Sequence, residues 1–205
     1  MIDFEWGYSF KHEYGSQYLI QGVTIANAYN SGSGIGAINI LGNSYIRYKN
    51  CVITGGYSDS NYGNISINAG GIILENCYIS AGKVGTNTTN NGNVYVGGNA
   101  SLTITGCTVA VGYINLHNSS TLTITGKNKI NGVVKINWAT NDYHIIIKSD
   151  AIVDMSTATG NINSLTTSGI TVEDGAKIIP YGSSTAQSLP AGTYTTIARD
   201  GTCTV

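Results

Sequence analysis

Apolar and polar residues alternate in short segments along the chain, and each segment ends at a small or turn-forming residue. The segments "YIRYKNCVI" (45–53) and "GIILENCYI" (71–79) have apolar or aromatic side chains two and four residues before the corner residue, Asn50 or Asn76. Alternation with a period of two predicts a β-strand with one buried face. Asn tolerates a left-handed backbone, so the pattern predicts a sharp bend after each strand.

The same arrangement of strand and corner recurs along the chain at an average spacing of about 25 residues. A second family of short alternating segments lies between the corners, with inward pairs such as Ile38/Ile40 and Ile65/Ile67. One bend in each repeat has a nearly constant length, and one loop varies. The corner residues are Gly22, Asn50, Asn76, Gly106, Gly126, Ser149 and Asp174.

These repeats predict an all-β fold, since no useful length of helical periodicity appears. Three short strands per repeat indicate a single-stranded parallel β-helix, or solenoid, with about seven turns of roughly 25 residues stacked at ~4.8 Å. We expect the β-helix at residues 18–182. Residues 1–17 are expected to form an N-terminal cap, and residues 183–205 to form C-terminal strands or the start of a following segment.

The strand–Asn/Gly–strand corner resembles the right-handed parallel β-helix superfamily of pectate-lyase-like proteins, including its adhesin-like non-catalytic members. The resemblance covers roughly residues 18–180 and implies a right-handed coil. It also implies that the segment "GNVYV" (92–96) belongs to the first sheet. The outer face of that sheet and its adjoining loops usually hold the substrate groove in this superfamily.

Charge is sparse, with 10 basic and 11 acidic residues and a net charge of −1. This balance argues against non-specific electrostatic binding of nucleic acid. No apolar run approaches the ~20 residues of a membrane helix, so no membrane insertion is expected. The 4 cysteines lack a paired CxxC spacing, and neither a metal nor a cofactor is expected. We expect an exported protein, extracellular or at the cell surface, whose signal peptide is not in this chain.

The repeated Asn-Cys corner is interpreted as architecture. A structural corner ladder is expected at Gly22, Asn50, Asn76, Gly106 and Gly126. The residues that follow three of these corners predict a column of small inward side chains, which are Cys51, Cys77 and Cys107. Three interpretations of this column stay open: buried free thiols, a disulfide between adjacent turns, and a metal site.

Catalysis is not indicated by the expected outer face of the first sheet. Enzymes that cut polysaccharides need carboxylates as acid, base or metal ligands. The positions assigned to this face, from Ala37 to Asn163, include no Asp or Glu. Glu75 is expected to pair with Lys49 of the preceding turn instead. This interpretation depends on the assignment of the sheets, and a site shared between chains would escape it.

Tyrosine is abundant, with 14 Tyr against 2 Phe. Exposed phenol rings beside amides and a histidine predict a strip that stacks on sugar faces and bonds sugar hydroxyls. Two other interpretations stay open, namely that these tyrosines pack along the edge of the coil or form a protein-contact surface. The glycan-binding candidates are Tyr57, Tyr62, Asn93, Tyr95, Tyr113, Asn115, His117 and Lys135.

The sequence therefore favours a non-catalytic extracellular β-helix module of an adhesin-like surface protein that binds glycans through a Tyr/Asn-rich face. One alternative is a polysaccharide lyase or glycoside hydrolase, including a phage-spike-type depolymerase with its site between subunits. Another is a purely structural stalk or assembly segment. The expected partners are a glycan or cell-surface ligand, and further copies or neighbouring domains that contact the ends of the solenoid.

Overall fold

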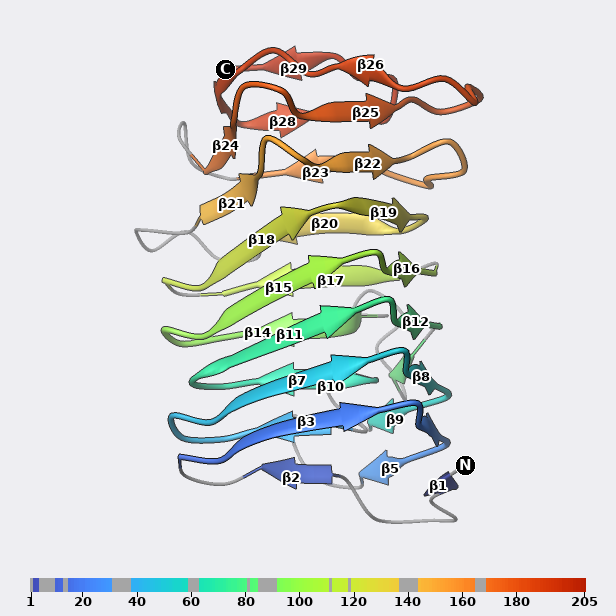
Figure 1. Ribbon diagram of the computed structural model, residues 1–205, viewed down its shortest axis with the longest axis vertical. Helices are drawn as coiled ribbons and strands as arrows, with labels where there is room; N and C mark the ends of the chain where they lie inside the picture. The colour runs from blue at the N-terminus through green and yellow to red at the C-terminus, as the bar shows by residue number, and fades with distance from the viewer. Residues whose placement is uncertain are drawn as a thin grey trace.

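The computed structural model describes residues 2–3, 10–12, 15–30, 38–58, 63–80, 82–84, 92–110, 112–117, 119–136, 144–164 and 169–205. Within these residues the regular elements are all β-strands, and no helix is assigned. The strands form three long sheets and one short sheet, which stack along the vertical axis of Figure 1. The predicted all-β solenoid is therefore confirmed.

We name the four sheets A to D. Sheet A contains β1 (Ile2–Asp3), β4 (Thr24–Ala26), β8 (Val52–Thr54), β12 (Tyr78–Ile79), β16 (Thr108–Val109), β19 (Lys127–Ile130), β22 (Ile152–Asp154), β25 (Lys177–Ile179) and β26 (Gln187–Ser188). Sheet B contains β2 (Phe10–His12), β6 (Ile38–Ile40), β10 (Ile65–Ile67), β14 (Gly92–Val96), β17 (Tyr113–Leu116), β20 (Val133–Ile136), β23 (Ile162–Asn163), β28 (Thr196–Ile197) and β29 (Cys203–Thr204).

Sheet C contains β3 (Gln17–Gln21), β7 (Tyr45–Lys49), β11 (Gly71–Glu75), β15 (Ser101–Thr105), β18 (Thr121–Thr125), β21 (His144–Ile147), β24 (Ile170–Val172) and β27 (Gly192–Tyr194). The short sheet D contains β5 (Tyr29–Asn30), β9 (Tyr57–Ser58) and β13 (Lys83–Val84). Sheet D lies in the loops of variable length, so these loops hold an additional strand that the alternation of apolar residues did not predict.

The chain visits sheets B, C and A in that order in each turn. Five turns, which begin at β6, β10, β14, β17 and β20, have parallel neighbours on both sides in all three of these sheets. The turn before them lies at the edge of sheets B and C, and the turn after them is covered by antiparallel strands. The predicted number of about seven turns is thus slightly high for the fully stacked part.

The coil is right-handed. In Figure 1 the strands of sheet C run from left to right across the front, and those of sheet B run from right to left behind them, while the chain climbs. Parallel registers keep equivalent residues in columns, as in the run from Ile46 through Ile72 and Leu102 to Leu122.

The core is a continuous apolar column inside the coil. It consists mainly of Ile, Leu and Val side chains that are almost completely buried, such as Ile38, Ile65, Ile104 and Ile145. Burying one such side chain contributes roughly 1.5–3 kcal/mol before the entropic cost of ordering it. The alternation of residues within each strand therefore determines which residues enter the core.

The two ends of the solenoid differ. At the C-terminal end β26, β27 and β28 pair antiparallel with the last parallel strands, and β29 pairs antiparallel with β28. At the other end β3 is the edge strand of sheet C, and its Tyr18 is exposed although the equivalent Ile46 of the next turn is buried. The division into a cap at 1–17, a β-helix at 18–182 and a tail at 183–205 stays a prediction.

Candidate functional site

The outward side of sheet B carries a polar row, as predicted for the first sheet. Its residues occupy equivalent positions on successive strands, because the strands pair in parallel register. The described side chains of the row are Asn39, Ser66, Tyr95, Asn115 and Asn163. These residues alternate with core residues such as Ile38 and Val94, which places them on the opposite face of the sheet.

Much of this row is closed to solvent, although the resemblance to the pectate-lyase-like superfamily implies that a groove usually lies on this face. Asn39 and Asn115 are 0% and 1% exposed, and Ser66 is also buried. The Asn68 amide donates hydrogen bonds to Asn39 Oδ1 (3.2 Å) and to Ser66 Oγ (3.1 Å), so hydrogen bonds within the chain fix this part of the face. The side chain of Asn115 is buried in this structure, and its role as a glycan-binding candidate stays a prediction.

Tyr95 and His117 form the part of this face that solvent partly reaches. Their rings come from adjacent turns, with centroids 5.8 Å apart and planes tilted by 44°. Both side chains are half-buried, and burial raises the pKa of Tyr95 above its usual value. Gly97 makes room for this pair, because a Cβ at that position would overlap the Tyr95 ring.

The other glycan-binding candidates are more scattered. Tyr113 is half-buried and lies on β17 two residues before Asn115, on the same face of the sheet. Tyr57 is half-buried in β9 of sheet D. Tyr62 and the side chains of Asn93 and Lys135 lie outside what the structure describes. The structure therefore brings Tyr95 and His117 together and leaves Tyr57 on a different sheet.

The five predicted ladder corners share a left-handed backbone. Their φ angles are 68° at Gly22, 53° at Asn50, 51° at Asn76, 65° at Gly106 and 63° at Gly126. Each corner allows the chain to leave sheet C for sheet A at the same height in successive turns. The Asn76 amide oxygen fills the space that a Cβ on Gly106 would require, so Asn and Gly fit together at this step of the ladder.

The three cysteines that follow these corners point into the core. Cys51, Cys77 and Cys107 are buried free thiols, so no disulfide joins them. Each thiol donates to backbone carbonyls, for example from Cys107 Sγ to Leu74 O at 3.2 Å. Burial raises the pKa of Cys51, and hydrogen bonding with Cys107 together with burial raises that of Cys77. Cys51 and Cys77 are therefore held as protonated thiols, which are poor nucleophiles.

Asn128 continues the cysteine column in the next turn, which the sequence analysis missed. The register pairs Thr108 with Lys129, so Asn128 stands where Cys107 stands one turn earlier. Its buried amide accepts from Cys107 N (2.9 Å) and donates to Thr125 O (2.8 Å). The alternation did not reveal this position, because one extra residue follows Gly126 before the register with β16 resumes.

Three carboxylates near the C-terminal half of the coil, Asp150, Asp154 and Glu173, bond to side chains and backbone groups within the chain. Asp150 accepts from the Thr125 hydroxyl at 2.8 Å, and Asp154 accepts from Ser156 N at 3.0 Å. Glu173 pairs with Lys148 at 2.5 Å. Among the residues that the structure describes, no three His, Cys, Asp or Glu side chains converge as a metal site.

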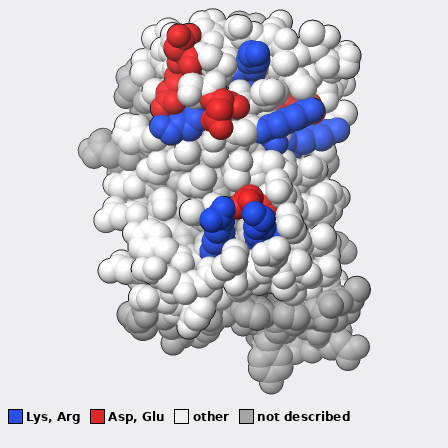
Figure 2. All heavy atoms as spheres, in the orientation of Figure 1, with Lys and Arg blue, Asp and Glu red and all other residues white. Residues whose placement is uncertain are grey.

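An ion trio lies on the outward face of sheet C. Lys49 Nζ is 2.6 Å from one oxygen of Glu75, and the Arg47 guanidinium bonds to the other oxygen. Hydrogen bonds from Lys49 and Arg47 lower the pKa of Glu75. Figure 2 shows two basic side chains on either side of an acidic one, and a second group of charged side chains higher on the same face. The predicted Lys49–Glu75 pair is present, and Arg47 joins it.

Comparison with known proteins identifies no relative. No family model matches the chain, and neither a curated protein nor a solved structure matches it. The search for helices that are long and apolar enough to cross a membrane finds none in the described residues.

Proposed function

We propose that this chain is a non-catalytic recognition module of an exported, adhesin-like surface protein, and that it binds glycans at the Tyr95–His117 pair. The observation that carries this proposal is the contact of the two rings at 5.8 Å on the outward side of sheet B. We also propose, from the Asn/Gly corners, that the chain is related to the pectate-lyase-like proteins.

The chemistry of this surface suits an uncharged, hydroxyl-rich ligand. The Tyr95 ring offers an apolar face for a sugar ring, and its hydroxyl and the His117 imidazole offer hydrogen-bonding groups. The half-buried Tyr113 adds a second phenol on the same face. Sugar recognition commonly combines such an aromatic surface with a few polar groups, and neither element requires a charged residue.

The surroundings of the pair favour binding over bond cleavage. The described side chains of the outward row of sheet B are amides, a hydroxyl and a phenol, at Asn39, Ser66, Tyr95, Asn115 and Asn163. Glycoside hydrolysis needs two carboxyl groups about 5–9.5 Å apart across the scissile bond. The carboxylate of Glu75 lies on sheet C and is held there by its two basic partners.

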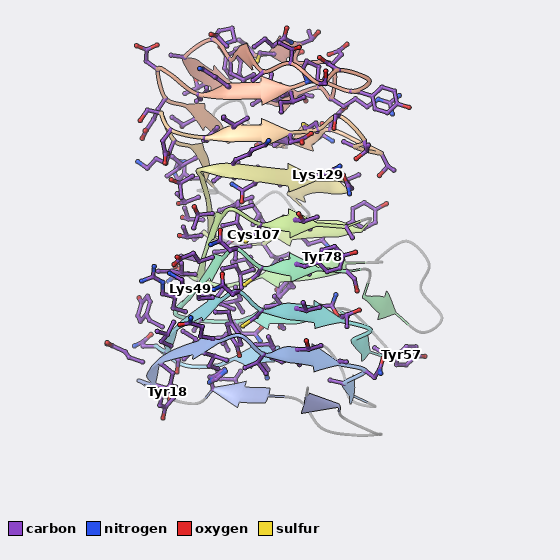
Figure 3. The ribbon with its side chains drawn as sticks, turned by 45° about the vertical axis from the view of Figure 1, so that its right-hand side comes forward. Tyr18, Lys49, Tyr57, Tyr78, Cys107 and Lys129 are labelled. Carbon is purple, nitrogen blue, oxygen red and sulfur yellow. The ribbon has the colours of Figure 1, made fainter. Side chains whose placement is uncertain are left out.

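A glycan array tests this proposal, with an assay for new reducing ends or unsaturated sugars on every glycan that binds. We expect binding without products, and about tenfold weaker binding for Tyr95→Ala, which removes one aromatic contact. Tyr78→Ala is the matched control, because it deletes an exposed strand tyrosine over sheet A, as Figure 3 shows.

The outcomes separate the hypotheses. Products would overturn the non-catalytic assignment and favour a lyase or hydrolase. Equal affinity of the wild-type protein and Tyr95→Ala would show that the glycan does not bind at the Tyr95–His117 pair on sheet B. Thermal unfolding of each variant, followed by circular dichroism, shows whether a loss of binding reflects loss of the fold.

A further inference from the structure

The outward face of sheet C carries a hollow that spans β7, β11 and β15. The parallel register aligns Tyr45, Gly71 and Ser101 in one outward row. Arg47, Ile73 and Thr103 form the next outward row. The hollow lies between these two rows and has a volume of about 180 Å³. Sheet C forms the front of the coil in Figure 1 and is a different sheet from the one that carries the Tyr95–His117 pair.

Gly71 shapes this hollow. Its neighbours in the row, Tyr45 and Ser101, have side chains, and both lean into the space over Gly71. The Tyr45 ring lies across that space, because its Cδ1 would lie 3.0 Å from a Cβ on Gly71. Ser101 Oγ would lie 2.5 Å from that Cβ on the other side. An aromatic ring and a hydroxyl group thus meet over Gly71 and line this part of the hollow.

Glu75 keeps Arg47 in a defined position at the rim. Arg47 donates through Nε and Nη2 to Glu75, and these bonds leave Nη1 for another acceptor. Lys49 bonds to the second oxygen of Glu75 at 2.6 Å and so helps to hold the carboxylate. A guanidinium held by a carboxylate is a pre-organised donor, which loses less conformational entropy when it binds a ligand.

The remaining walls combine apolar surface with hydroxyl groups. Tyr45 is 57% exposed and Ile73 is 42% exposed, which is unusual for side chains of this size. Among the described residues, the hydroxyl groups of Tyr45 and Thr103 have no hydrogen-bond partner, so they can bond a ligand. The hollow thus offers a ring to stack on, donors from Arg47, and hydroxyl groups that both donate and accept.

We propose that this hollow binds one uncharged pyranose ring of a glycan, independently of the site on sheet B. The volume of about 180 Å³ is smaller than the roughly 300–1,000 Å³ of typical ligand pockets, which suits one ring and not an oligosaccharide. The sugar ring stacks on Tyr45. Vicinal hydroxyls of the sugar accept from Arg47 and exchange hydrogen bonds with Ser101 and Thr103.

The charges of the ion trio favour an uncharged ligand over an anionic one. Glu75 neutralises one of its two basic partners, so the trio carries a net charge of +1 in an exposed position. Solvent and salt screen such a charge, and an anionic ligand would also compete with Glu75 for Arg47. Hydroxyl groups can bond to Nη1 without displacing the carboxylate.

Nuclear magnetic resonance titration of the full chain with a panel of neutral methyl pyranosides tests the site. We expect saturable shifts of the amide signals of Gly71, Ile73, Ser101 and Thr103 with at least one sugar, unchanged in 0.5 M salt. Tyr45→Ala should weaken binding about tenfold, since it removes the stacking surface. Tyr78→Ala should bind like the wild-type protein.

A second variant tests the site without relying on the stability of the Tyr45→Ala protein. Gly71→Ala puts a Cβ within 2.5 Å of Ser101 Oγ and 3.0 Å of the Tyr45 ring, so both side chains must move from the walls of the hollow, and it should abolish the shifts while thermal unfolding stays cooperative. Shifts that do not saturate with any neutral pyranoside, or that persist in Gly71→Ala, would overturn the proposal. Binding of a methyl hexuronide alone, lost in 0.5 M salt, would overturn it as well.

The nuclear magnetic resonance titration tests the sheet C site and the glycan array tests the sheet B site, so either proposal can be wrong without the other. Tyr45→Ala and Gly71→Ala should leave array binding at the Tyr95–His117 pair intact if the sheet B proposal holds. Tyr95→Ala should leave the shifts of Gly71 and Thr103 intact if the sheet C proposal holds.

Discussion

His12 Nε2 lies 2.8 Å from the hydroxyl oxygen of Tyr48, and this contact joins two residues that are 36 positions apart. The imidazole comes from β2 of sheet B and the phenol from β7 of sheet C, and both side chains are buried. The Tyr48 hydroxyl thereby satisfies a polar group inside an otherwise apolar coil, near the end where Tyr18 is exposed.

Acidification should destabilise the protein through His12. Burial lowers the pKa of His12 below the 6.5 of an exposed histidine. At pH values between the His12 pKa of the folded chain and that of the unfolded chain, the unfolded chain binds more protons. The contribution of His12 to stability is therefore fully present above about pH 6.5 and is lost as the pH falls below it. Tyr48 and Cys51, which lie nearby, have raised pKa values and do not titrate in this range.

Urea unfolding at pH 7.5 and pH 5.5 measures this loss as a lower midpoint at pH 5.5. In His12→Gln the part of the difference that His12 contributes should disappear. An unchanged pH dependence in that variant would assign the effect to other groups.

Removing the Tyr48 hydroxyl should cost stability. Tyr48→Phe keeps the ring but leaves His12 Nε2 without this buried partner, and we expect a loss of about 1–3 kcal/mol in the free energy of unfolding. Tyr18→Phe is the control, because the Tyr18 side chain is exposed and only its ring approaches His12, at 6.2 Å between centroids. Equal unfolding midpoints for the two variants would contradict the prediction.

At the Asn76 corner, substitution by alanine should lower the free energy of unfolding more than substitution by glycine. The φ of 51° is a left-handed conformation that costs a residue with a Cβ about 1–2 kcal/mol and costs glycine little. We therefore expect Asn76→Ala to be less stable than Asn76→Gly by about 1 kcal/mol, measured by chemical denaturation. If both variants lose the same amount, the amide side chain matters and the backbone conformation does not.

Replacing Asn128 should destabilise the fold more than replacing an exposed asparagine. Asn128→Ala leaves Cys107 N and Thr125 O without their amide partner, and an unsatisfied buried group costs about 1–3 kcal/mol. Asn99→Ala, at an exposed turn, serves as the control and should change the unfolding midpoint little. A midpoint for Asn128→Ala as high as that of Asn99→Ala would show that other groups satisfy the column.

The thiols should react in two classes. Cys203 is partly exposed, whereas Cys51, Cys77 and Cys107 are buried in the core. A thiol reagent such as dithiobis(nitrobenzoic acid) should therefore modify one cysteine in the native protein, slowly because burial raises the Cys203 pKa, and all four in denaturant. Modification of a second cysteine without denaturant would mean that the coil opens near the corner ladder.

The sequence was a good guide to the inner face of the coil. Alternation identifies residues such as Ile46 and Leu74 as inward, because a period of two leaves one choice of face. It also identifies the corners, because few residues accept a left-handed backbone as readily as Gly and Asn. Right-handedness followed from the resemblance carried by these corners.

The accessibility of the outer face was less predictable. Alternation shows that Asn39 and Asn115 point away from the core, but it does not show whether the chain also closes that side. The hollow at Gly71 was missed because a missing side chain leaves no mark in the apolar pattern, and its effect depends on how Tyr45 leans across strands. Asn128 was missed because one shifted residue changes the register of the whole column.

The antiparallel strands β26 to β29 determine where this architecture can lengthen during evolution. A duplicated turn placed after β25 meets strands that run in the opposite direction, so it finds no edge of matching polarity. A duplicate inserted between two corners, for example between Asn50 and Asn76, finds parallel neighbours above and below. An added turn therefore fits between existing corners and not beyond β25.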